Sequence, residues 1–140
     1  MKILFFSLFF TSIIFLIIDV IWLSYAVKYF YKPQLGDLLN EKPVMWAAIG
    51  FYLVYVIGLS IIILQPAIIN ESISQAFWMG IVFGIVAYGT YNLTNMATVK
   101  NWSSYVVFID MFWGGFLTAC YTVKGFSDHV QDFQDFLEGC

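Results

Sequence analysis

Four long apolar stretches constrain this chain more than any other feature of its sequence. They cover about residues 3–27, 44–64, 75–95 and 105–123. About 20 apolar residues are needed for an α-helix to cross the hydrocarbon core of a bilayer. Only helices and closed barrels satisfy every backbone hydrogen bond there. The sequence therefore predicts an all-α fold, an integral membrane bundle of four transmembrane helices.

The composition supports a membrane protein and excludes several other classes. Hydrophobic residues make up 61% of the 140 residues and charged residues 11%, whereas about 25% of the residues of soluble domains are charged. The chain has a net charge of −3, so nucleic acid is not a predicted partner. Its one histidine, His129, lies outside the apolar stretches, and its two cysteines have no metal-ligand spacing. We therefore predict no metal and no cofactor.

The first apolar stretch could also be interpreted as a signal peptide. Its apolar core is longer than the roughly 7–15 residues of such peptides, and it contains an acid, Asp19. The triplet Ser24-Tyr25-Ala26 matches a cleavage site poorly. We expect this stretch to be retained as a transmembrane helix.

The first loop, residues 28–43, begins with three aromatic residues, Tyr29, Phe30 and Tyr31, which are typical of a membrane interface. After Pro33, three leucines follow at helical spacing. This pattern predicts a short interfacial helix on the membrane surface, and a plain polar loop is the alternative.

The last segment, residues 125–140, is predicted to be a separate amphipathic tail helix after a transmembrane domain of residues 1–124. Its apolar side chains share one helical face, and its acids lie mostly elsewhere. We expect it to pack on the loops or on a partner protein, with a frayed tail as the alternative. The apolar face consists of Phe126, Val130, Phe133 and Leu137.

The third apolar stretch changes character along one helical face. Ala76, Gly80, Gly84, Tyr88 and Asn92 recur every four positions and so share that face. Two small residues four apart, here the two glycines, favour close helix packing. The second half of the face is aromatic and polar. We therefore expect the first half to pack tightly and the second half to border a site.

Two acids lie inside the apolar stretches at a comparable depth. Asp19 is about eight residues before the end of the first stretch, and Asp110 is about six residues after the start of the fourth. Both therefore lie roughly 10 Å below the same membrane face at 1.5 Å per residue. An ionised carboxylate costs at least about 2.5–3.5 kcal/mol in a bilayer. The acids need partners, and a protonated or proton-sharing Asp19/Asp110 pair is one hypothesis.

Polar and aromatic side chains from all four stretches are expected at this level. Trp22 and Trp113 each follow an aspartate by three positions and so share its helical face. Gly114, next to the second tryptophan, is a further position for close helix packing. The predicted ligand-binding or proton-relay residues are Asp19, Trp22, Tyr52, Tyr88, Tyr91, Asn92, Asn95, Asp110 and Trp113.

Three functions are compatible with this cluster. The first is the binding or transport of a small polar or cationic solute, or of protons, by a homodimer formed through Gly80 and Gly84. The second is a membrane scaffold or accessory subunit in which the cluster is structural. The third is a lipid-acting enzyme with Asp19 or Asp110 as general base. We consider an enzyme less well supported, because no serine has a histidine to activate it.

The distribution of lysines predicts the orientation. Lys2, Lys124 and the chain amine lie on the side of the termini, and four other lysines lie on the opposite side. Because positive residues favour the cytoplasm, we expect both termini outside. The four lysines of the predicted cytoplasmic loops are Lys28, Lys32, Lys42 and Lys100.

Several short motifs together resemble a family of small bacterial inner-membrane proteins that is known only as a domain of unknown function. The resemblance implies a four-span protein of the bacterial inner membrane, and it brings no activity, substrate or cofactor. The matching motifs are Ile18-Asp19-x-x-Trp22, Leu35-Gly36, Phe51-Tyr52-x-x-Tyr55-x-x-Gly58, Pro66-Ala67, Tyr88-Gly89-Thr90-Tyr91-Asn92-Leu93-Thr94-Asn95, Asn101-Trp102 and Asp110-Met111-x-Trp113-Gly114.

Overall fold

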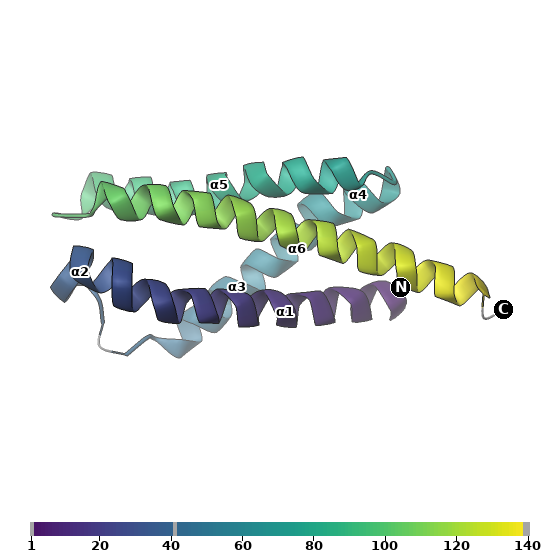
Figure 1. Ribbon diagram of the computed structural model, residues 1–140, viewed down its shortest axis with the longest axis horizontal. Coiled ribbons are helices and arrows are strands. Elements are labelled where there is room, and N and C mark those ends of the chain that lie inside the picture. The colour runs from purple at the N-terminus through teal and green to yellow at the C-terminus, as the bar shows by residue number, and fades with distance from the viewer. Residues whose placement is uncertain (1, 41, 139–140) are drawn as a thin grey trace.

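The protein folds as a bundle of long helices that lie side by side (Figure 1). The computed structural model describes residues 2–40 and 42–138, and the side chains of residues 12–40, 42–135 and 138. Every regular element in this part of the chain is helical. The all-α prediction is therefore confirmed.

The first two membrane crossings are composite helices. In the first, α1 (Lys2–Ala26) continues through a π-helical turn, Val27–Tyr31, into α2 (Lys32–Leu35). A short 3₁₀ turn, Gly36–Leu38, ends this run. In the second, α3 (Met45–Leu59) continues through the π-helical turn Ser60–Leu64 into α4 (Gln65–Ile69).

Both π-helical turns come just before a proline. Pro33 and Pro66 lack an N–H, and a proline ring crowds the carbonyl four residues earlier. At the end of each π turn the backbone N–H donates to the carbonyl five residues back, from Lys32 to Val27 and from Gln65 to Ser60. A wider turn of this kind lets the chain remain helical on both sides of the proline.

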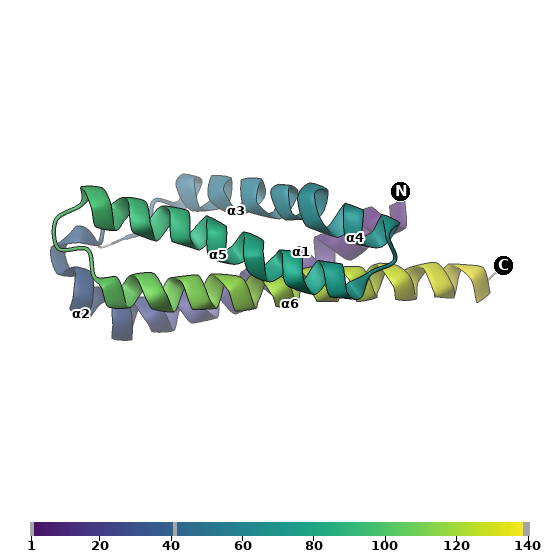
Figure 2. The ribbon, with the colours of Figure 1, turned by 90° about the horizontal axis from the view of Figure 1, so that it is seen from above.

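The other two crossings are single helices, α5 (Ile73–Thr98) and α6 (Ser104–Glu138). They run side by side and are joined by a short loop (Figures 1 and 2). Within the described residues, four helical runs are long and apolar enough to cross a membrane. These runs are Ser12–Leu38, Met45–Ile69, Ile73–Thr98 and Ser104–Asp135.

The predictions of a separate interfacial helix and a separate tail helix are wrong. Residues 32–38 extend the first helical run instead of forming a helix of their own. The tail continues α6 without a break through Gly125, because one glycine costs a helix only about 1 kcal/mol. Residues 139–140 of the predicted tail and the side chain of Leu137 lie outside the described part.

The α5–α6 contact forms because α5 presents glycines to α6. A Cβ atom on Gly80 would lie 2.9 Å from Ala119 Cα, and one on Gly84 would collide with the carbonyl oxygen of Gly114. No side chain larger than hydrogen fits at these two positions without moving backbone. This face of α5 is therefore already covered by α6, and a homodimer could use it only if the two helices separated.

The core lies between α1, α3 and α6. Phe15 is 97% buried, with its ring 5.9 Å from that of Tyr55 and 5.2 Å from that of Tyr121. Outward-facing side chains are apolar and exposed, as at Val54 (75%) and Phe112 (77%). Such a surface suits contact with lipid rather than water. The chain is a multi-pass membrane protein.

Candidate functional site

Asp19 is held by two other helices. Its side chain is only 2% exposed. The Tyr52 hydroxyl of α3 donates a hydrogen bond to Oδ2 over 2.5 Å, and the Trp113 indole N–H of α6 donates to Oδ1 over 3.1 Å. The carboxyl group thus ties α1 to α3 and α6.

Asp110 is held in the same way by two further partners. Its side chain is 6% exposed. The Tyr31 hydroxyl, at the end of the first π-helical turn, donates to Oδ1. The Asn92 amide of α5 donates to Oδ2 over 3.0 Å. The expectation that both acids need partners within the bundle is confirmed, and these partners include tyrosine and asparagine side chains.

Asn92 links Asp110 to the loop before α6. The Asn92 side chain is fully buried. Its Nδ2 also donates to the Tyr88 carbonyl over 3.1 Å, and its Oδ1 accepts the Trp102 indole N–H over 3.4 Å. The amide therefore uses both of its N–H donors and one of the two lone pairs of its oxygen.

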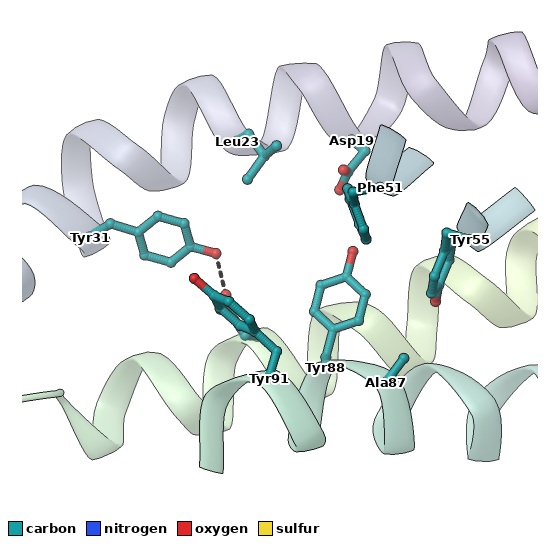
Figure 3. Close-up of a pocket in the computed structure, with 9 residues that line it drawn as sticks. Asp19, Leu23, Tyr31, Phe51, Tyr55, Ala87, Tyr88 and Tyr91 are labelled. Carbon is teal, nitrogen blue, oxygen red and sulfur yellow. Dashed lines mark hydrogen bonds between the residues drawn. The ribbon is translucent and has the colours of Figure 1, made fainter. Parts of the chain in front are cut away.

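The two acids line one cavity of about 490 Å³ (Figure 3). All four membrane crossings contribute to its wall. No direct hydrogen bond joins the two carboxyl groups in the described structure, so each acid has its own set of partners. The cavity is lined by Asp19, Leu23, Tyr31, Phe51, Tyr55, Ala87, Tyr88, Tyr91 and Asp110.

Two tyrosine hydroxyls of the cavity make no hydrogen bond with any described residue. They belong to Tyr88 and Tyr91, one turn apart on α5. Figure 3 shows the Tyr88 hydroxyl directed toward Asp19 and the Tyr91 hydroxyl directed toward Tyr31. The cavity therefore offers two hydroxyl groups besides the two carboxyls.

Gly114 makes room for Tyr88. A Cβ atom on Gly114 would collide with the Tyr88 ring. One turn earlier on α5, Gly84 packs against the backbone carbonyl of Gly114. The small residues of the α5–α6 contact therefore let the Tyr88 ring lie against α6 while its hydroxyl faces α1.

A pair of tryptophans packs beside the Asp19 carboxyl. Trp22 and Trp113 stack with their ring centroids 4.3 Å apart and their planes 14° from parallel. Trp113 donates to Asp19. The Trp22 indole nitrogen is buried and makes no hydrogen bond within the described part of the chain.

The predicted site residues fall into three groups. Asp19, Tyr88, Tyr91 and Asp110 line the cavity. Tyr52, Asn92 and Trp113 hold the acids from outside it, and Trp22 packs behind Trp113. Asn95 is half-buried, does not line the cavity, and makes no side-chain hydrogen bond to a described residue.

The sequence interpretation missed three aromatic residues of the wall. Tyr31 was assigned to the membrane interface, whereas the helical run carries it back to Asp110. Tyr55, whose hydroxyl lies 2.6 Å from Thr118 Oγ1, shares the Tyr-x-x-Tyr spacing of Tyr52 and could have been found from it. Phe51 begins the same motif, Phe51-Tyr52-x-x-Tyr55, which carries the family resemblance but does not by itself indicate the cavity.

The arrangement brings together groups that attract positive charge. It combines two carboxyl groups and five aromatic rings with four tyrosine hydroxyls, of which those of Tyr88 and Tyr91 make no hydrogen bond with a described residue. Faces of aromatic rings attract cations. Among the described residues, no group of three or more His, Cys, Asp or Glu side chains comes together to hold a metal ion.

Comparison with known proteins places the chain in a family. No curated protein and no solved structure matches it. A family model described as "Predicted membrane protein (DUF2177)", a domain of unknown function, matches residues 4–127. The match covers most of the chain and includes part or all of each of the four crossings, so the expected family resemblance is confirmed. The chain belongs to this family of membrane proteins.

Proposed function

We propose that this protein binds a small cationic or polar solute, or protons, in the cavity between Asp19 and Asp110, as a binding or transport module of the bacterial inner membrane. One observation carries the proposal. Two acids from opposite ends of the chain line the same cavity of about 490 Å³ within the bundle.

The electrostatics of the cavity favour a cation. A carboxylate inside a bilayer is costly unless a positive charge or hydrogen bonds compensate for it. Each acid receives two hydrogen bonds from neutral groups, and no lysine is among the lining residues. A bound cation would supply the missing positive charge, and the surrounding rings would add cation–π attraction.

A purely structural role for the acids is the alternative. The hydrogen bonds from Tyr52 and Trp113 to Asp19 would by themselves hold the helices together. A purely structural cluster, however, requires no cavity next to the acids, and well-packed protein interiors have few voids larger than a water molecule. Each carboxylate oxygen also has a second lone pair that these bonds do not use.

Asparagine variants can remove the charge while retaining the hydrogen bonds. At each acid one partner can only donate, the Trp113 N–H at Asp19 and the Asn92 N–H at Asp110. The other partner at each is a tyrosine hydroxyl, which can also accept. In Asp19→Asn and Asp110→Asn the amide oxygen can face the obligate donor and the NH₂ can face the tyrosine.

The test is a thermal-shift titration of the purified protein with sodium, potassium, ethylammonium and n-decylammonium. We expect at least one cation to raise the unfolding temperature of the wild type. Asp19→Asn and Asp110→Asn should fold and lose this response. Asp37→Asn, which removes an exposed acid of the 3₁₀ turn Gly36–Leu38, is the matched control and should keep the response. Folded variants with the same response as the wild type, or no response to any cation, would support the scaffold instead.

A further inference from the structure

The cavity reaches the outside of the bundle on its flank. Two of its lining side chains are strongly exposed, Phe51 of α3 (47%) and Tyr91 of α5 (61%). Phe51 lies six residues after Met45, where α3 starts, and Tyr91 lies seven residues before Thr98, where α5 ends. At 1.5 Å per residue, the opening is about 10 Å below these helix ends.

The divergence of α3 from α5 explains this opening. Figure 1 shows the start of α3 well separated from α5. At its other end the same helical run packs on α5 through Ser60–Leu64 and α4. The two helices therefore separate toward the start of α3, the half of that helix that carries Phe51, and Phe51 and Tyr91 line the cavity from the two helices.

The two helices that border the opening are uncharged and mostly apolar. Neither α3 nor α5 carries a charged residue. Both helices carry exposed apolar side chains, such as Val54 of α3 (75%) and Val86 of α5 (59%). In a bilayer this part of the flank faces acyl chains. A ligand that enters here comes from the membrane and needs an apolar part.

The two acids of the cavity determine which polar head group the ligand can carry. The oxygens of Asp19 and Asp110 each accept one hydrogen bond from the protein and can accept another. A primary ammonium group has three N–H donors to offer them. A phosphate on the ligand would be repelled by the acids, and no lysine among the lining residues would compensate for it.

From these features we infer that the site takes a lipophilic amine, a primary ammonium on a hydrocarbon chain, which enters laterally from the bilayer between α3 and α5. This inference rests on the proposed function and adds the ligand class and its route. A water-soluble amine shares the chemistry of the head group, so the test must distinguish the two sources.

The experiment uses the full chain in lipid nanodiscs with a decylamine that carries a photoreactive diazirine at the end of its chain. Crosslinked positions are mapped by mass spectrometry, and n-decylamine, ethylamine and n-decanol compete. We expect labelling on α3 and α5 near Phe51 and Tyr91. Each methylene group removed from water strengthens binding about fourfold. The concentration of n-decylamine that suppresses labelling should therefore be more than about tenfold lower than that of ethylamine.

The alcohol and the asparagine variants separate recognition of the head group from simple partitioning into lipid. Decanol should not compete, and Asp19→Asn and Asp110→Asn should lose the labelling. Equal competition by ethylamine would overturn the lateral route and leave the proposed function intact. Competition by decanol, with label spread over the exposed face of α6 at Phe108, Phe112 and Phe116, would show lipid contact only and overturn the inference. Failure of every amine to compete, with wild-type labelling of the variants, would overturn the inference, and the thermal-shift response to sodium and potassium would then decide the proposed function.

Discussion

At the scale of single residues, Asn92 and Asn95 show how differently two polar residues of one helix can be used. They lie three positions apart on α5, and the sequence assigned both to the cluster. Asn92 is fully buried and joins Trp102, Tyr88 and Asp110. Asn95 makes no comparable side-chain contact in the described structure. The spacing of four from Gly84 through Tyr88 to Asn92 identifies the inward residue, and Asn95 is off that register.

The two asparagines make a matched pair for a stability test. Asn92→Leu removes three hydrogen bonds and leaves the Trp102 N–H and one Asp110 oxygen without these partners. We expect it to destabilise the protein by about 1–2 kcal/mol, the range found for polar contacts between membrane helices. Asn95→Leu, the same substitution at the half-buried position, should cost much less.

The measurement is the thermal unfolding midpoint of each variant in detergent. Equal loss of stability in both variants would contradict the hydrogen-bond network. A larger loss in Asn95→Leu would contradict it more strongly, because the structure gives that side chain nothing to hold.

At the scale of helices, the site depends on the close contact between α5 and α6. The Tyr88 ring can lie against α6 only because Gly114 has no side chain. The glycines are thus part of the architecture of the cavity, even though they do not line it. A change in this contact should alter both the stability of the bundle and the position of Tyr88.

Alanine at Gly84 tests this contact. Its Cβ would collide with the Gly114 carbonyl, which is backbone and cannot rotate away. We expect Gly84→Ala to destabilise the protein by about 1–3 kcal/mol, as overpacking usually does. Gly50→Ala, on α3 with nothing within 4 Å of the new Cβ, is the control and should be close to neutral.

Chemical denaturation of both alanine variants in mixed micelles provides the comparison. If Gly84→Ala were as stable as Gly50→Ala, the two helices could not be as close as the structure places them.

The sequence predicted the helices better than the wall of the site. Apolar stretches of sufficient length predicted four crossings, and matched depths indicated that the acids would lie at one level. The position of Tyr31 could not be predicted, because it depends on a helix that continues past residue 27 with a π-helical turn before Pro33. Whether a helix ends before a proline or widens depends on tertiary packing, which local sequence does not encode.

At the scale of the whole molecule, the orientation in the membrane decides which side the site faces. Asp110 lies six residues after the start of α6 and 28 before its end, so the cavity that it lines lies toward the loop that precedes α6. With the termini outside, as the lysines favour, the site lies toward the cytoplasmic side. Both ends of the described chain lie toward the opposite end of the bundle, and α6 extends beyond the start of α1 (Figure 2).

Cysteine labelling tests this orientation in a Cys120→Ser, Cys140→Ser background. Asn70→Cys and Ser104→Cys place exposed thiols near opposite ends of the bundle and change no lysine. We expect a membrane-impermeant maleimide to label Asn70→Cys in intact cells and Ser104→Cys only after permeabilisation. The reverse pattern would place the termini in the cytoplasm.

The length of α6 has a mechanical consequence. Its 35 residues measure about 52 Å at 1.5 Å per residue, while the hydrocarbon core is only about 30 Å thick. Unless α6 tilts steeply, its acidic C-terminal part extends beyond the bilayer as a continuous helix. A protein that bound the C-terminal end of α6 would be held at a fixed distance from the membrane. A force applied at that end would be transmitted along the same helix that carries Asp110.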